Sequence, residues 1–129
     1  MIVDTSALLA IVLGEPESPR FASAIVDAPS AGISVANFLE AAIVLERRGD
    51  VLARGRLDPV TADLGLAFLP VTAAQMHRAR AAFVRFGKGR HPAGLNFGDC
   101  FAYALAEETG EPLLFKGEDF ARTDIPRAV

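Results

Sequence analysis

Several acidic residues of this chain lie in apolar or glycine-rich stretches, where a carboxylate has few polar neighbours. Asp4 follows the run MIV, Glu40 lies inside VANFLEAAIVL, and Asp99 precedes CFAYALA. Glu118 and Asp119 form a further acidic position in the segment PLLFKGEDF. An isolated carboxylate in apolar surroundings is unfavourable, so such residues usually find a cation, a hydrogen-bond donor or a metal ion.

Three or four carboxylates that converge on one cleft would form an oxygen-rich site suited to Mg²⁺ or Mn²⁺. Without a cation, like charges held this close would force some of the carboxylates to be protonated. A metal site of this type activates water and stabilises the charge that develops on a phosphate during in-line displacement. The acidic positions therefore predict phosphodiester hydrolysis, provided that the fold brings them together.

Each acidic residue also has a purely structural interpretation. Asp4 can cap the helix that follows it, and this role leaves one carboxylate oxygen free to face a metal. Asp99 falls in the first turn of a predicted helix, where the helix dipole favours a negative charge. Glu40 can be a partly buried residue paired with an arginine, while Glu118 and Asp119 can form a solvated turn.

A basic loop comes shortly before Asp99. Residues 87–96 read GKGRHPAGLN and carry Lys88, Arg90 and His91. The glycines allow backbone amides to approach a phosphate closely, although a flexible solvated loop is the alternative interpretation. Beside an acidic metal site, we interpret this loop as the arm that holds a nucleic-acid backbone.

Other catalytic schemes fit the sequence less well. It contains no GxSxG, Walker-type, CxxC or HExxH motif. His77 is predicted on the polar side of a helix and His91 in the basic loop, so no zinc site is expected. Cys100 lies near a helix start, which can lower a thiol pKa, but no histidine partner is visible for nucleophilic catalysis.

Length and composition predict one globular domain covering residues 1–129. The chain is 51% hydrophobic and 22% charged, and its net charge of −3 argues against a broadly basic nucleic-acid coat. The longest apolar run near the start, ALLAIVL, is too short to span a bilayer and does not resemble a signal peptide. A single cysteine fits a reducing compartment, so we expect a cytoplasmic protein.

Strands and helices are predicted to alternate. We expect strands at the start of the chain, around residue 33, and at residues 67–71 and 113–115, with helices at residues 7–13, 19–27, 35–48, 50–65, 72–86 and 97–108. Gly55 and Pro59 weaken the fourth helix, which Asp58 could restart as a cap. This alternation predicts an α/β domain with a parallel sheet, whose ligands bind at the carboxyl ends of the strands, where Asp4 lies.

Four motifs, in this order and spacing, resemble PIN domains and specifically the VapC toxins of bacterial toxin–antitoxin systems. They are MIVDTSALLAI, SVANFLEAAIVLERR, GKGRHPAGLNFGDCFAYALA and PLLFKGEDF, and the resemblance covers essentially the whole chain. It implies a parallel sheet of four to five strands flanked by helices, and an Mg²⁺-dependent endoribonuclease. Asp4, Glu40 and Asp99 would form the metal site, with Thr5 and Ser6 supporting it through hydrogen bonds.

One departure from the family pattern concerns the fourth carboxylate. Many PIN domains carry an aspartate where this chain has Gly117. The fourth carboxylate then comes from Asp119, which we prefer, or from Glu118, or it is missing. The presence of a second metal ion is open for the same reason.

The resemblance further implies a homodimer and a VapB-type antitoxin, whose tail would insert a basic side chain toward the carboxylates. Phe21, Leu39 and Ile43 are candidates for an apolar docking surface, and core and dimer interface are the alternatives for the same residues. We expect the RNA substrate to be tRNA or ribosomal RNA, cut in a single-stranded loop. The alternatives are a non-toxin PIN nuclease of RNA maturation or DNA processing, and an inactive PIN module that binds RNA or a partner.

Overall fold

The computed structural model describes all of residues 1–129 and contains one parallel sheet of four short strands. The strands are β1 (Ile2–Val3), β2 (Gly32–Ser34), β3 (Ala67–Leu69) and β4 (Leu113–Leu114), in the spatial order β3-β2-β1-β4. The helices are α1 (Thr5–Val12), α2 (Ser18–Asp27), α3 (Val35–Arg48), α4 (Val51–Asp63), α5 (Ala73–Phe86) and α6 (Phe97–Thr109), followed by a 3-10 turn at Phe120–Arg122. The predicted α/β fold with a parallel sheet is confirmed.

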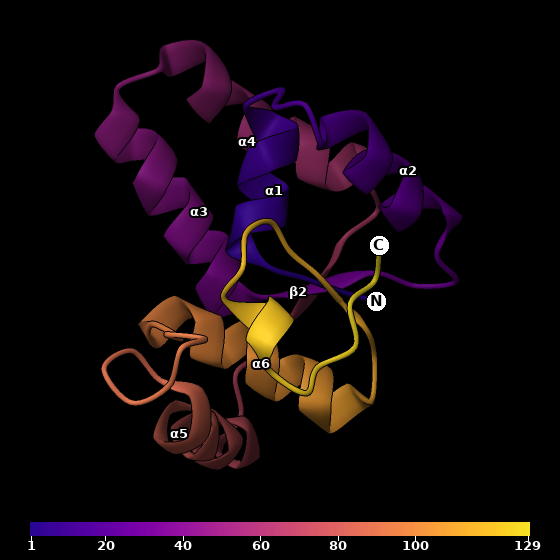
Figure 1. The fold of residues 1–129 in the computed structure, drawn as a ribbon. Coiled ribbons are helices and arrows are strands. Elements are labelled where there is room, and N and C mark those ends of the chain that lie inside the picture. Colours follow the sequence, from indigo (N-terminus) through magenta and orange to yellow (C-terminus); the bar gives the residue numbers. More distant parts are fainter.

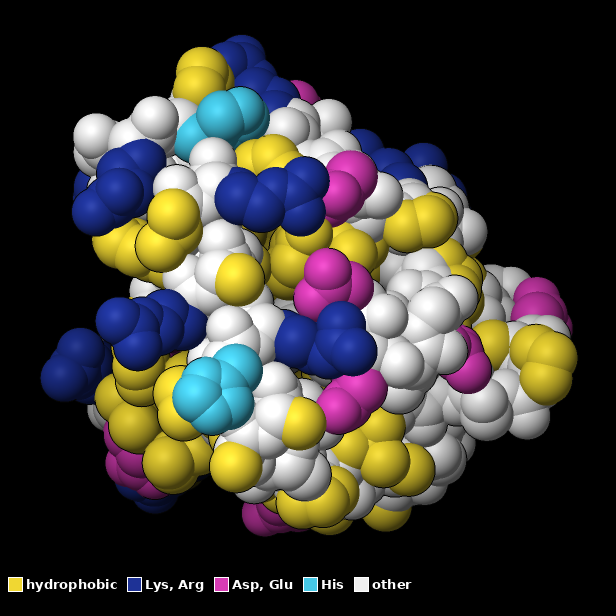
Figure 2. All heavy atoms as spheres, turned by 90° about the horizontal axis from the view of Figure 1, so that it is seen from below, with side chains coloured by type: hydrophobic (Ala, Val, Ile, Leu, Met, Phe, Trp, Pro, Cys, Tyr) yellow, Lys and Arg dark blue, Asp and Glu magenta, His cyan; other side chains and the backbone are white.

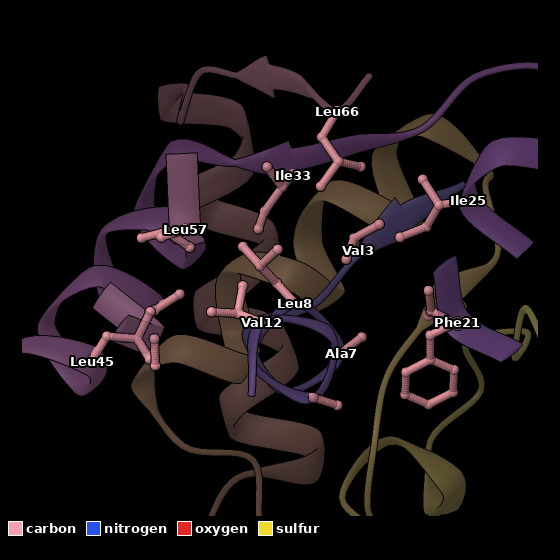
Figure 3. Packing of buried hydrophobic residues seen from close by; sticks show 14 residues of the cluster. Val3, Ala7, Leu8, Val12, Phe21, Ile25, Ile33, Leu45, Leu57 and Leu66 are labelled. Atoms are coloured by element: carbon pink, nitrogen blue, oxygen red, sulfur yellow. The ribbon is translucent and has the colours of Figure 1, made fainter. Parts of the chain in front are cut away.

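Helices cover both faces of the sheet, and all residues of strands β1, β2 and β4 are buried. Val3 faces a core formed with α1 to α4 (Figure 3), and Leu114 belongs to the same core. Ile2 and Leu113 face a second core formed with α5 and α6. Successive residues of a strand point to opposite faces, which explains this alternation. Figure 1 shows α1, α2 and α4 on one side of the sheet, with α5 and α6 on the other.

The strand order creates a crevice at the carboxyl edge of the sheet. Strand β1 pairs in parallel with both β2 and β4, and β3 lies outside β2. The chain therefore runs outward from β1 in one direction through β2 and β3, and later returns to the opposite side of β1 as β4. Such a switch of direction leaves room for a ligand beyond the strand ends. Asp4 follows β1 directly and lies at this edge.

Helix α4 runs without a break through Pro59, so the predicted restart at Asp58 is wrong. Asp50 caps the helix by accepting a hydrogen bond from the amide of Ala53 at 3.0 Å. Ala53, Leu57 and Thr61 lie on one buried face that spans the proline position. Tertiary burial along this face holds the helix together despite the local penalty of an internal proline.

Helix α3 buries a different face from the one that its large apolar residues suggest. Its buried side chains are Asn37, Ala41 and Leu45, whereas Leu39 and Ile43 are exposed. These three positions are four residues apart and so share one face of the helix, while Leu39 and Ile43 lie on the exposed side. Phe21 is 1% exposed and belongs to the core, which was one of the alternatives left open for it, and so it is not part of a docking surface. None of the helices combines the length and apolar character that a membrane crossing requires.

Candidate active site

Asp4 is buried at the start of α1, where its two carboxylate oxygens have different surroundings. Oδ2 accepts hydrogen bonds from the amide of Ser6 at 2.9 Å and from its hydroxyl at 2.5 Å. Oδ1 is buried and has no hydrogen-bond partner. Burial raises the pKa of Asp4 to about 6, the Ser6 hydrogen bonds oppose this rise, and the charge of Glu40 adds to it. The predicted helix cap is thus present, and one oxygen is left over for a ligand.

Ser6 also ties Asp4 to the acidic turn that follows β4. Its Oγ accepts a hydrogen bond from the backbone amide of Lys116 at 3.0 Å, while it donates to Asp4. The Lys116 ammonium points elsewhere and pairs with Glu15 at 2.7 Å and Glu17 at 3.3 Å. The lysine therefore anchors the turn to the loop between α1 and α2 without neutralising the buried carboxylate.

Glu40 approaches the site from the middle of α3. Its Oε1 accepts a hydrogen bond from the hydroxyl of Thr5 at 2.5 Å. Its carboxylate also packs against Gly98, where a Cβ atom would come within 2.1 Å of Oε2. No arginine pairs with this side chain, so the structural interpretation of Glu40 as half of an ion pair is wrong.

Asp99 lies in the first turn of α6, within a reciprocal capping box. Its Oδ2 accepts a hydrogen bond from the amide of Asn96 at 2.9 Å, and its own amide donates to Asn96 Oδ1 at 2.9 Å. The pKa of Asp99 is raised to about 7, mainly by burial and further by the charges of Asp4, Asp119 and Glu40. The charges of all three other acidic groups therefore act on Asp99.

The acidic turn contributes through Asp119. Asp119 is exposed, and its charge is among those that raise the pKa of Asp99. Gly117 adopts a positive φ of 98°, a conformation that glycine accepts without strain, so it serves the shape of the turn. This arrangement favours Asp119 as the fourth acidic group, while Glu118 remains an exposed residue of the same turn.

The side chains fit a hard divalent cation by their chemistry. Asp4 and Asp99 are buried, the charge of Asp4 raises the pKa of Asp99, and neither receives a hydrogen bond from a lysine, arginine or histidine. No three acidic, histidine or cysteine side chains are grouped closely enough to hold one ion directly. Mg²⁺ usually keeps several waters and binds proteins through one or two carboxylates, so a pair such as Asp4 and Asp99 is a suitable ligand set.

The basic loop at residues 87–96 is held by its own backbone and does not behave as a flexible solvated loop. The amide of Lys88 donates to the carbonyl of Leu95, and the amides of Arg90 and His91 both donate to that of Gly87. A Cβ atom at Gly87 would lie 2.3 Å from the carbonyl oxygen of Phe83, which explains the glycine. With these amides occupied, a phosphate would be bound chiefly by side chains.

Lys88 and Arg90 are exposed and have no acidic partner. His91 is partly buried: its ring meets that of Phe86 edge-on at 5.1 Å, and its Nδ1 accepts a hydrogen bond from the amide of Ala93. The role of His91 in the loop is therefore at least partly structural. Figure 2 shows Lys and Arg side chains interspersed with hydrophobic ones on the face of α5 and α6.

Sequence reasoning overlooked Asn37. Its side chain is 0% exposed and links α3 to Thr5 and to the carbonyl of Gly98. The available signal was an amide side chain in an apolar helix, four and eight residues before the buried Ala41 and Leu45. That spacing places Asn37 on the buried face, where a polar group requires partners.

The remaining candidates for catalysis do not belong to the site. Cys100 is buried, and burial raises the pKa of its thiol to about 11, so the helix start does not activate it. His77 is exposed on α5, as predicted. Neither residue offers a competing mechanism.

Comparison with known proteins identifies the family of this chain. The family model described as "PIN domain" matches residues 1–126. The chain belongs to the PIN domain family. Among curated relatives, "Ribonuclease VapC" of Mycolicibacterium smegmatis is 48% identical over 125 residues, which cover 97% of each chain. "Ribonuclease VapC28" of Mycobacterium tuberculosis is 45% identical over 130 residues, which cover 100% of this chain and 98% of the relative.

Two solved PIN-like structures agree with the fold. The structure of Mycobacterium tuberculosis VapC20, described as a Sarcin-Ricin loop cleaving toxin, aligns with a TM-score of 0.76 at 20% identity and covers 96% of this chain and 95% of that one. A toxin-antitoxin complex from Klebsiella pneumoniae aligns with a TM-score of 0.71 at 17% identity, covering 95% and 92%. At these identities the likeness establishes the fold alone.

Proposed function

We propose that this PIN domain is the toxin of a type II toxin–antitoxin system and acts as a metal-dependent endoribonuclease on structured RNA. The observation that carries the proposal is the buried pair Asp4 and Asp99 at the carboxyl edge of the sheet, each with a raised pKa and no cationic partner. The ribonuclease names of relatives that match this chain over nearly its full length support the same activity.

Mg²⁺ is the proposed cofactor, and Mn²⁺ is suited to the same oxygen ligands. Asp4 and Asp99 would hold the ion directly, while Glu40 and Asp119 lie near enough to act on Asp99 electrostatically. When bound, the ion would supply an activated water and stabilise negative charge on the phosphate. Ser6 and Asn96 keep the two aspartates oriented through their hydrogen bonds.

The proposed substrate is an unpaired loop of tRNA or ribosomal RNA. Sequence-specific recognition of RNA usually targets loops whose bases can be splayed out. Lys88 and Arg90 would contact the phosphate backbone beside the site, because their charges are exposed and unpaired. The cytoplasm is the proposed place of action, since it contains both classes of RNA.

A second copy of this chain is the proposed occupant of an exposed apolar face. Two grooves, one between α5 and α6 and one between α3 and α6, share Phe97 and Phe101 and so form one surface. Phe97 is 81% exposed and Leu39 is 59% exposed. Large contiguous apolar surfaces are uncommon on monomers, and a two-fold dimer would bury the same face on each copy.

A VapB-type antitoxin is the other proposed protein partner. A basic side chain of its tail would pair with the carboxylates in place of the cation and block access of the metal or the RNA. No lysine, arginine or histidine of this chain pairs with Asp4 or Asp99, so a basic side chain of the antitoxin would not have to displace one. This supports the proposed form of inhibition.

Cleavage of RNA by the purified protein tests the proposal. We expect cleavage with Mg²⁺, none with EDTA, and a large loss in Asp4→Asn and Asp99→Asn. Asparagine retains the helix-capping acceptor at position 4, so the variant tests the charge and not the cap. Equal cleavage by the wild type and both variants would contradict the mechanism.

Expression in cells separates the toxin from the alternative functions. A toxin should arrest growth unless a neighbouring antitoxin gene is expressed with it, and sequencing of new RNA ends should reveal one preferred cut site. A PIN nuclease of RNA maturation should cut without arresting growth. An inactive binding module should produce no new ends.

A further inference from the structure

Asn37 occupies a closed position between the elements that carry the acidic residues. Its Nδ2 donates to the carbonyl oxygen of Gly98 at 2.9 Å and to the hydroxyl oxygen of Thr5 at 3.2 Å. A backbone carbonyl can only accept, so the nitrogen of the amide must be the atom that faces Gly98. The orientation of the Asn37 side chain is fixed by this contact.

The same amide directs the proton of Thr5. Because Asn37 donates to the Thr5 oxygen, the single hydroxyl proton remains free for another acceptor. The two acceptors within reach are Glu40 Oε1 at 2.5 Å and the backbone oxygen of Asn37 at 3.1 Å. The shorter contact favours Glu40, which gives a chain of donation from Asn37 through Thr5 to Glu40.

This chain of hydrogen bonds joins the three acidic elements. Thr5 follows Asp4 at the start of α1, Glu40 lies one turn beyond Asn37 on α3, and Gly98 precedes Asp99 on α6. Glu40 packs against Gly98, but Asn37 is the side chain of α3 that donates a hydrogen bond to the backbone there. The amide therefore holds the start of α6 at a fixed distance from the start of α1.

Stability alone does not explain an asparagine at this position. Its Oδ1 is buried and has no hydrogen-bond partner. A buried polar group that is only partly satisfied is unfavourable compared with a well-packed apolar residue. The two hydrogen bonds from Nδ2 therefore explain why this position is an asparagine. They reach Thr5 and Gly98, which are the sequence neighbours of Asp4 and Asp99.

We propose that Asn37 is a positioning residue for the acidic metal site, and through that site for RNA cleavage. It sets the separation of Asp4 from Asp99 and the direction of Glu40 without contacting the substrate. The proposal rests on the function proposed above, because it assumes that these carboxylates act together on a cation. Outer hydrogen-bond partners of metal ligands typically affect metal affinity or activity by about 10–100-fold.

The test compares Asn37→Ala with Thr5→Val, a variant of matched shape that removes only the hydroxyl. For each variant, calorimetry measures the Mn²⁺ affinity, cleavage of an RNA oligonucleotide gives kcat and KM, and thermal unfolding gives the Tm. We expect kcat and Mn²⁺ affinity to fall about 10–100-fold, with KM for RNA little changed. The double variant should lose about as much as either single one, since both break one chain.

Two controls separate positioning from general destabilisation. Thr5→Ser retains the hydroxyl and should restore most of the kcat and Mn²⁺ affinity that Thr5→Val loses. Thr61→Val removes another buried hydroxyl, which donates to Leu57 within α4, and should leave kcat and Mn²⁺ affinity unchanged.

The outcomes distinguish this proposal from the proposed function. Wild-type cleavage together with unchanged kcat and Mn²⁺ affinity in folded Asn37→Ala and Thr5→Val would overturn the positioning role and leave the function intact. The wild type could also bind Mn²⁺ but cut no RNA, while both variants lose Mn²⁺ affinity. That result would support the positioning role and refute the function. A wild type that binds no Mn²⁺ would overturn both.

Discussion

Asp4 and Asp99 are both buried, and the charge of Asp4 acts on Asp99, which makes the metal-free site unfavourable at neutral pH. Burial raises both pKa values, and each is raised further by neighbouring carboxylates. Such perturbed groups in a crevice are typical of catalytic sites, where stability is lost in exchange for function. A divalent cation would relieve this repulsion, because it interacts favourably with the ionised forms.

The pH dependence of stability follows from these two residues. In the folded chain their pKa values are about 6 and about 7, above the ordinary value of 3.8. At a pH between 3.8 and the raised pKa values, the folded chain still holds protons that the unfolded chain has released. The free energy of unfolding therefore falls as the pH rises through this range. In EDTA we expect the Tm of the wild type to fall from about pH 5 to about pH 8, and added Mn²⁺ to reduce that fall.

Asp99→Asn provides the matched control for this effect. The amide can still accept the hydrogen bond from Asn96, but it has no charge to repel Asp4. In EDTA the variant should have a higher Tm than the wild type at pH 8, and the difference should shrink toward pH 5. A difference independent of pH would show that the charge of Asp99 is not the cause.

Gly98 tests how closely the acidic residues must pack. A methyl group at this position would overlap Glu40, because the added Cβ lies 2.1 Å from Oε2. We expect Gly98→Ala to displace that carboxylate and to lower kcat about 10–100-fold, measured by RNA cleavage.

Gly55→Ala is the control for a glycine inside a helix. Nothing lies within 4 Å of a Cβ at this position on α4. It should stabilise the protein by about 0.5–1 kcal/mol without changing kcat. Full activity in Gly98→Ala would show that the close contact with Glu40 is unimportant.

At the scale of the elements, the sequence predicts local features better than packing. The cap expected at Asp4 is confirmed, because a cap depends on a side chain and an amide a few residues away. The helix expected at residues 50–65 is present as α4, but the sequence left a restart at Asp58 open, because continuity through Pro59 depends on burial against distant helices.

The same limit applies to the site. Asp4 and Asp99 stand out in sequence because carboxylates are rare in apolar runs. Asn37 does not stand out, because its partners Thr5 and Gly98 are 32 and 61 residues away. Only the fold shows that α3 turns this amide toward both of them and turns Leu39 toward solvent.

The basic loop at residues 87–96 carries a prediction of its own. Lys88→Ala combined with Arg90→Ala should weaken RNA binding and reduce the slope of log K against log salt by about 1.4, because two phosphate contacts are lost. Binding is measured by fluorescence anisotropy with catalysis blocked in EDTA. Mn²⁺ affinity should not change, because neither side chain contacts the carboxylates.

Arg56→Ala serves as the comparison for that experiment. Arg56 is exposed on α4, which packs into the core on the other side of the sheet. RNA affinity should remain as in the wild type. A loss of Mn²⁺ affinity in the double loop variant would instead indicate that the loop supports the fold of the site.

At the scale of the whole molecule, the apolar face of α3, α5 and α6 lies beside the acidic crevice. Gly98 and Glu40 line the same groove as Phe97, so an interface here would border the site. Figure 2 shows hydrophobic side chains exposed among the basic ones on the α5 and α6 side. Assembly and RNA binding are therefore expected to share one side of the molecule.

Charge placed on this face should prevent dimerisation. We expect Phe97→Glu to convert the protein to a monomer in light scattering coupled to size-exclusion chromatography, because burial of a glutamate in an apolar interface is unfavourable. Leu52→Glu is the control, since Leu52 is 76% exposed on α4 and lies outside the face. A dimer that persists in Phe97→Glu would place the interface elsewhere.

Calorimetric titration of Mn²⁺ into the wild type and Asp99→Asn, at pH 6 and pH 8, tests the central claim most directly. Carboxylates with pKa values of about 6 and 7 must release protons when a cation binds. The wild type should bind Mn²⁺ at both pH values, more weakly and with greater proton release at pH 6, and Asp99→Asn should bind poorly at both. Equal binding by the two proteins, with no proton release at pH 6, would contradict a metal site built on these aspartates.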